Sequence, residues 1–149
     1  MRIAGKTRGN APCTVIWKLI FNPGSLLQLI PGCDQVEQVS SDQYRASLTL
    51  HVPALAGNYA IQIQVMDSNE PQFCRLSGNA RGPGGTIQGT GSVTLLPQDQ
   101  KTLIQYECEI QISGPLAGMH PRFVEGVAQT LIRQGLTKLA ELSRSQPQP

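Results

Sequence analysis

The sequence predicts an α+β domain in which a curved antiparallel sheet of about seven strands wraps around one long C-terminal helix, with two short helices after the first strand. Apolar and polar residues alternate in successive runs between Gln43 and Ser113, with short turns between them. After Ser113 the apolar spacing changes to three to five residues, which is typical of an amphipathic helix. Before Asp34, two short apolar segments are interrupted by proline and glycine.

The strands follow from the alternation of residue types. Met1–Asn10 is the expected first strand and Asp34–Val39 a short second one. The longer strands are expected at Gln43–Val52, Gly57–Asp67, Thr86–Leu96 and Lys101–Ser113, with one more that contains Gly78 and Ala80. Short hairpin connections favour antiparallel neighbours. We expect them at Ser40–Asp42, Pro53–Gly57, Asp67–Pro71, Arg81–Gly85 and Pro97–Gln100.

Two short helices are predicted between the first and second strands. Asn10 offers a capping side chain and Pro12 a proline in the first helical turn. The second helix is expected at Ser25–Ile30 and is stopped by Pro31-Gly32.

The long helix is predicted from its apolar residues Leu116, Met119, Phe123, Val127, Leu131, Leu136, Leu139 and Leu142. Pro121 should either start the main helix or kink it. Gly126 is expected to let the helix approach another backbone closely. We expect one domain over residues 1–142 and a frayed tail over 143–149, which ends in Gln-Pro-Gln-Pro.

Composition excludes several classes of function. Twelve Lys and Arg against ten Asp and Glu give a net charge of only +2, without the clustered basic stripe of a nucleic-acid-binding protein. The four cysteines lack metal-ligand spacing and are expected to be free thiols in a reducing cytoplasm. The chain shows neither a secretory leader nor an apolar run long enough to span a bilayer, so any membrane contact would be peripheral.

The inner face of the predicted sheet carries no charge, which favours holding something apolar, or nothing, over acid–base chemistry. Gly78, Ala80, Gly89 and Gly91 leave volume on this face that side chains do not fill. Two interpretations stay open, a bend with tight helix contact and an open cavity. Arg75 is the strand charge whose direction the pattern leaves undecided.

The candidate catalytic groups have simpler interpretations, so we predict no catalytic residue, metal or cofactor. His51 and His120 lack a neighbouring nucleophile and acid in a recognisable spacing. Glu107 and Glu109 fall on the wet face. Arg81–Gly85 precedes a strand and not the helix that a phosphate cradle requires, so it is either a flexible hairpin or a gate.

Two further features have open interpretations. Tyr44, Tyr59 and Tyr106 are either polar groups that orient a ligand or phenols that reach solvent or a backbone carbonyl. The apolar turn Pro53–Ala56 either contacts a membrane or partner, or packs against a neighbouring loop.

Several segments in this order resemble the family of carbon monoxide dehydrogenase G subunits, part of the START-like (SRPBCC) helix-grip superfamily. They include Ala11-Pro12 with Trp17, Leu29–Asp34, Tyr44-Arg45, Val52–Gly57, Gly78–Gly91 and Phe123–Ala128. The resemblance implies a helix-grip fold with an apolar cavity between sheet and helix. It also implies a non-catalytic role beside a molybdenum-containing carbon monoxide dehydrogenase, by membrane recruitment or quinone delivery. Longer members have an anchoring extension, whereas this sequence stops at Pro149.

The combined prediction is a cytoplasmic carrier, peripheral at most to the membrane, that holds an isoprenoid quinone or lipid tail. The alternatives are an enzyme of the polyketide cyclase or lipid hydrolase kind, and a docking adaptor with a filled core. The expected cavity residues are Trp17, Leu27, Ile30, Tyr44, Leu48, Tyr59, Ile61, Ile63, Leu76, Gly89, Gly91, Val93, Tyr106, Cys108, Ile110, Phe123, Val127 and Leu131.

Overall fold

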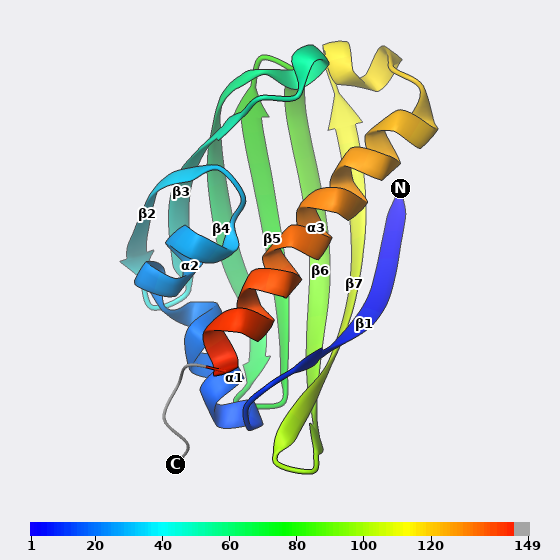
Figure 1. Ribbon diagram of the computed structural model, residues 1–149. Helices are drawn as coiled ribbons and strands as arrows, with labels where there is room; N and C mark the ends of the chain where they lie inside the picture. Colours follow the sequence, from blue (N-terminus) through cyan, green and yellow to red (C-terminus); the bar gives the residue numbers. More distant parts are fainter. Residues whose placement is uncertain (145–149) are drawn as a thin grey trace.

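The computed structural model describes residues 1–144 and has the predicted α+β architecture (Figure 1). One sheet contains seven antiparallel strands in the order β1-β7-β6-β5-β4-β3-β2. The strands are β1 (Arg2–Gly9), β2 (Cys33–Ser40), β3 (Gln43–Leu50), β4 (Gly57–Asn69), β5 (Phe73–Gly82), β6 (Gly85–Gln98) and β7 (Lys101–Ser113). The helices are α1 (Cys13–Phe21), α2 (Pro23–Leu29) and α3 (Pro121–Arg144), with 3₁₀ turns η1 (Pro53–Leu55) and η2 (Pro115–Gly118).

The long helix α3 crosses one face of the curved sheet diagonally, while the other face stays uncovered (Figure 1). Its backbone packs mainly against α1, α2 and the edge strand β1. The two short helices sit at one end of the sheet, and η1 and η2 sit at the opposite end (Figure 1). The concave face of the sheet is therefore closed at both ends by short elements and spanned by one helix.

Strand register confirms which residues share the inner face. Neighbouring strands place uncharged residues opposite one another in one cross-strand row, which is Tyr44, Ile63, Gly78, Gly89 and Ile110. The polar residues that alternate with them along each strand point to the other face of the sheet. The row shows that the alternation has the same phase in five successive strands.

Some strand ends differ from the predicted ones. β3 ends at Leu50 and not at Val52, because Pro53 begins the 3₁₀ turn η1. β6 and β7 pair as far as Gln98 and Lys101, which leaves a two-residue turn. Both turn residues have positive φ, 50° at Asp99 and 65° at Gln100. The strand twist favours this turn type, so the hairpin is tighter than the sequence indicated.

The predicted cap of the first helix is wrong. Pro12 occupies the N-cap position of α1, which has no side-chain capping bond. The Asn10 amide is used elsewhere, donating from Nδ2 to the carbonyl of Ala140 over 3.0 Å. The second helix begins earlier than expected, at Pro23, because Asn22 Oδ1 accepts a 3.1 Å hydrogen bond from the Ser25 amide.

The C-terminal helix starts at Pro121, one of the two expectations for this proline. Leu116 and Met119 therefore precede the helix, and Leu116 belongs to η2. The predicted frayed tail is wrong at its start, because Ser143 and Arg144 are helical and Ser143 is fully buried. The remainder of that tail, 145–149, lies outside the described residues.

Candidate functional site

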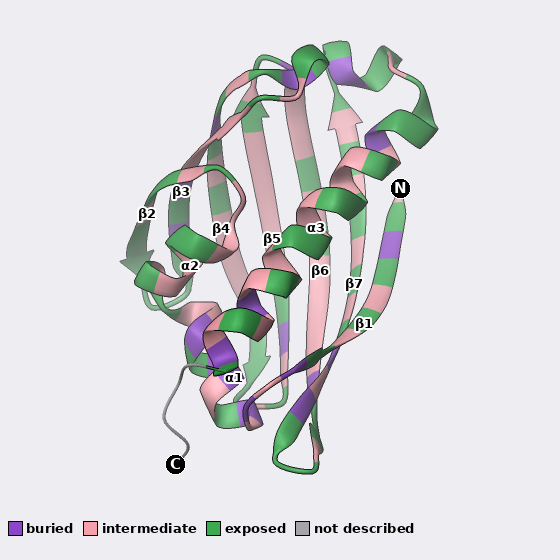
Figure 2. Ribbon diagram, in the orientation of Figure 1, coloured by how far each residue is buried: buried purple, intermediate pink, exposed green. Residues whose placement is uncertain are grey.

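Buried apolar residues of the described chain form two separate clusters, with Ile3, Tyr44, Ala46 and Tyr59 buried outside them. One surrounds α1 and the end of α3, with Ile16, Trp17, Leu95 and Leu139 among its members. The other lies at the opposite end of the sheet, around Leu55, Leu116 and Val124. Figure 2 shows half-buried strand segments between these ends, beneath the middle of α3. The inner face is thus packed at both ends and only partly covered in the centre.

The glycines of α3 show how the helix sits over this central region. The expected close approach at Gly126 is wrong, because a Cβ built there would meet nothing within 4 Å. A Cβ at Gly135 would instead lie 2.9 Å from the carbonyl oxygen of Leu29. The helix therefore touches α2 closely through its second half, while Gly126 faces open space.

The strand glycines Gly78, Gly89 and Gly91 are not in close contact with the helix. A Cβ at Gly78 would meet only the carbonyl oxygen of Gln62 within 4 Å, at 3.2 Å. At Gly89 and Gly91 the nearest atoms belong to β7, at 3.1 Å and 3.2 Å. Of the two open interpretations, tight helix contact at these glycines is wrong, because no helix atom is among the nearest atoms at any of the three.

An apolar pocket of about 730 Å³ opens between the first half of α3 and the end of β3. A volume of this size is typical of small-molecule sites. Gly32 closes one side, because its carbonyl accepts a 2.9 Å hydrogen bond from the Thr49 amide. The lining is Pro31, Gly32, Thr49, Leu50, His51, Val52, Arg122, Phe123, Gly126, Val127, Thr130, Leu131 and Gln134.

The structure separates the predicted cavity residues into groups. Phe123, Val127 and Leu131 line the pocket. Trp17 belongs to the packed cluster at α1, and Leu27 is 43% exposed on α2. Tyr44 and Tyr59 are buried. The others are half-buried, a group made up of Ile30, Leu48, Ile61, Ile63, Leu76, Gly89, Gly91, Val93, Tyr106, Cys108 and Ile110.

Two of the three inner tyrosines are satisfied by backbone groups. The Tyr44 hydroxyl donates to the carbonyl of Phe21 over 2.8 Å. The Tyr59 hydroxyl donates to the carbonyl of Leu55 over 2.9 Å and accepts from the Gly84 amide over 3.0 Å. Within residues 1–144, the Tyr106 hydroxyl has no hydrogen-bond partner and lies over Gly5 of the edge strand. Tyr106 is thus the one inner phenol left to meet solvent or a ligand.

Burial favours the neutral forms of two titratable groups on the inner face, Tyr44 and Cys108. Burial raises the pKa of the Tyr44 phenol. Burial also raises the pKa of the Cys108 thiol, and the neighbouring Glu109 and Glu107 carboxylates raise it further. Arg75 points away from this face, since it pairs with Asp67 at 3.6 Å and both side chains are more than half exposed. The inner surface is therefore uncharged, as its sequence pattern predicted.

His51 and Arg122 were not among the predicted site residues, although both line the pocket. His51 is exposed, as expected for the outer phase of its strand, but it lies just beyond the end of β3. Arg122 is the second residue of α3. The sequence does not show that the start of α3 lies beside the end of β3, so it could not predict that Arg122 and His51 share a pocket.

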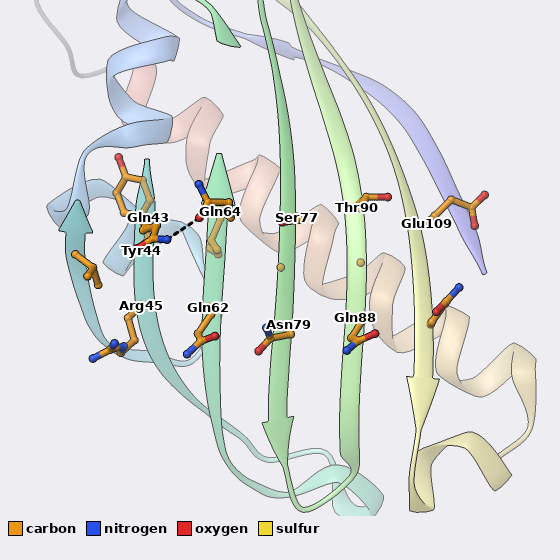
Figure 3. Close-up of a pocket in the computed structure, with 15 residues that line it drawn as sticks. Gln43, Tyr44, Arg45, Gln62, Gln64, Ser77, Asn79, Gln88, Thr90 and Glu109 are labelled. Carbon is orange, nitrogen blue, oxygen red and sulfur yellow. Dashed lines mark hydrogen bonds between the residues drawn. The ribbon is translucent and has the colours of Figure 1, made fainter. Parts of the chain in front are cut away.

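The uncovered face of the sheet contains a second hollow, of about 600 Å³, with a polar lining (Figure 3). Side chains of successive strands form it, and they include Gln62, Asn79 and Gln88 (Figure 3). Gln43 donates to Gln64 across it over 2.8 Å. This hollow is suited to water and hydrogen-bonding groups, so the apolar pocket is the better candidate site for an apolar ligand.

The remaining sequence predictions concern the Pro53–Ala56 turn, the cysteines, metal binding and membrane spans. The Pro53–Ala56 turn packs inward through Leu55, which is 4% exposed, while Pro53, Ala54 and Ala56 are exposed. All four cysteines are free. No group of His, Cys, Asp and Glu within residues 1–144 could hold a metal ion. In the same range, no helix is both long and apolar enough to cross a membrane.

The sequence matches the family described as the carbon monoxide dehydrogenase G subunit (CoxG) over residues 5–142. The chain belongs to the CoxG family. A comparison with curated proteins found no match.

Solved structures support the same fold assignment for this CoxG-family chain. A conserved protein from Geobacillus kaustophilus is 26% identical, with a TM-score of 0.92 over 97% of this chain and 95% of that one. A START superfamily protein from Mycobacterium smegmatis is 10% identical, with a TM-score of 0.75 over 96% and 97%. A protein from Chromobacterium violaceum is 14% identical, with a TM-score of 0.76 over 97% and 99%. The fold is therefore START-like.

Proposed function

We propose that this protein is a non-catalytic carrier that holds an apolar ligand, an isoprenoid quinone or a lipid tail, between its sheet and α3. The observation that carries the proposal is the uncharged, half-buried inner face between two packed core clusters. Residues 1–144 would form the binding domain. The half-buried residues predicted above would line the ligand's path, and Phe123, Val127 and Leu131 would stand at its mouth.

Burial alone supplies enough driving force for this kind of binding. Each methylene moved from water into an apolar site contributes about 0.8 kcal/mol. The apolar pocket opens to solvent at Phe123, which is 40% exposed, so a tail could enter without passing the packed ends. Entry would then depend on movement of the first half of α3, where Gly126 faces open space.

Family membership supports an accessory role beside a molybdenum-containing carbon monoxide dehydrogenase. In this proposal the protein acts in the cytoplasm, meets the membrane surface during exchange, and delivers or recruits without doing chemistry itself. The enzyme alternative needed a charged group on the inner face, and Arg75 lies outside with Asp67. The adaptor alternative needed a filled core, whereas the centre of the inner face is half-buried.

Native mass spectrometry and lipid extraction of protein purified under mild conditions test the proposal. We expect a co-purified isoprenoid or lipid on the wild-type protein. Val127→Trp would fill the pocket and should abolish this mass, while Gln129→Trp, on an exposed position of α3, should keep it. Repeatedly empty spectra together with no binding of added ubiquinone-2 would count against the proposal.

A further inference from the structure

The mouth of the apolar pocket carries the positive charge of Arg122 without a matching acid. Arg122 and His51 line it beside Leu50, Val127 and Leu131, and no Asp or Glu belongs to the lining. A guanidinium at the end of an apolar pocket favours a ligand with a negatively charged end, which neutral groups at that position would not do. The arrangement is suited to a ligand with a long tail and an anionic end.

Arg122 is available for an incoming anion. The described residues form three ion pairs, Arg2–Glu107, Arg75–Asp67 and Lys138–Glu141, and none uses Arg122. Its side chain has no hydrogen-bond partner within residues 1–144. Only its backbone amide is engaged, donating to His120 Nδ1 over 3.1 Å.

The acids nearest in sequence to the mouth are engaged in other contacts. Asp34 Oδ2 accepts a 2.8 Å hydrogen bond from Thr49 Oγ1. Glu125 Oε1 accepts from Gln129 Nε2 over 3.3 Å, on an exposed part of α3. Neither acid lines the pocket, so neither neutralises Arg122 there.

The start of α3 adds to the positive potential at the same place. The aligned peptide dipoles of a helix give its N-terminus a partial positive charge. α3 has 24 residues and begins at Pro121, so Arg122 stands in its first turn. A guanidinium also offers a planar set of donors that matches a carboxylate or a phosphate in two parallel hydrogen bonds.

We propose that the ligand of this pocket is an amphipathic anion, an acyl or prenyl chain that ends in a carboxylate or phosphate, with the tail against Leu50, Val127 and Leu131 and the acid on Arg122. The inference rests on the proposed function, since it uses the same pocket. It goes further by assigning a charge to the ligand, which a neutral quinone lacks.

The test compares ligands of equal tail length by isothermal titration calorimetry at low salt. Laurate and dodecyl phosphate represent the two sources of the anion, and dodecanol is the neutral reference. Because charge-assisted hydrogen bonds are stronger than neutral ones, we expect at least one anion to bind about tenfold more tightly than dodecanol. The stronger of the two anions identifies the source.

Two arginine variants complete the test. Arg122→Gln should lower the affinity for the anion to about that for dodecanol. Arg133→Gln, at an exposed position of the same helix outside the pocket, should change neither. Both positions are exposed, and circular dichroism of each variant checks that the fold is kept.

The outcomes separate this inference from the proposed function. If dodecanol and ubiquinone-2 bind as well as the anions, or if Arg122→Gln has no effect, the anion inference is overturned and the apolar carrier stands. If none of the four ligands binds, both fail.

Discussion

The backbone amide of Asn10 donates a 2.9 Å hydrogen bond to Ser143 Oγ, which joins the end of β1 to the last turn of α3. Ser143 Oγ in turn donates to the carbonyl of Ala140 over 2.8 Å, and Asn10 Nδ2 donates to the same carbonyl over 3.0 Å. Ser143 is completely buried. This network fixes the end of the helix that spans the sheet.

Ser143→Ala should therefore lower the free energy of unfolding by about 1–2 kcal/mol, because the partly buried Asn10 amide loses its acceptor. Thr137→Ala, at an exposed position of the same helix, should change it much less. Urea denaturation of the three proteins measures both effects. Equal stability of Ser143→Ala and the wild type would contradict the role given to this network.

The two glycines in the body of α3 should respond differently to replacement by alanine. Gly126→Ala should raise stability by up to about 1 kcal/mol, since alanine is the better helix former and the added methyl meets nothing. Gly135→Ala should gain less or lose stability, because its Cβ would lie 2.9 Å from the Leu29 carbonyl oxygen. Thermal denaturation of both variants checks this, and a larger gain at Gly135 would show that α2 and α3 are not in close contact.

Tyr59→Phe should destabilise the protein by about 1–3 kcal/mol, because it leaves the Gly84 amide and the Leu55 carbonyl without their buried partner. Tyr106→Phe removes a hydroxyl that has no partner in the described chain, so stability should change little. Chemical denaturation of the pair separates a structural phenol from a free one. Similar losses in both variants would contradict the assignment.

Stability should fall at alkaline pH in part through Cys74. Burial raises the pKa of this thiol from its ordinary value of 9.0 to about 11. The unfolded chain therefore ionises first, so this stabilising contribution is complete below pH 9 and is lost as the pH rises to about 11. The free energy of unfolding of Cys74→Ala should fall less steeply than that of the wild type between these values, and parallel curves would rule out the contribution.

Much of the fold could be predicted because one face of each strand is buried and the other is wet. The alternation within each strand alone predicted which residues face inward. The strand pairing then shows that these residues form one row from Tyr44 to Ile110. The ends of strands and helices were less predictable where a side chain that could cap a helix forms its hydrogen bond with a residue far away in the sequence. Asn10 resembles a helix cap, yet its amide reaches Ala140 at the other end of the chain.

The candidate site was predictable only in part. The absence of charge on the inner face is a property of the sequence alone. The opening of the pocket depends on where α3 stands above the sheet, and the helical pattern did not distinguish Gly126, which faces space, from Gly135, which contacts α2. His51 and Arg122 meet at the mouth because of that placement, so sequence spacing could not reveal them.

A methyl-resolved NMR titration with ubiquinone-2 tests most directly whether the apolar pocket beside α3 is open to a ligand. We expect saturable shifts at Leu50, Val127 and Leu131, which line the pocket, and none at Leu96, which is 40% exposed and lies outside it. No saturable shift at the pocket residues, or equal shifts at Leu96, would show that this pocket does not hold the ligand.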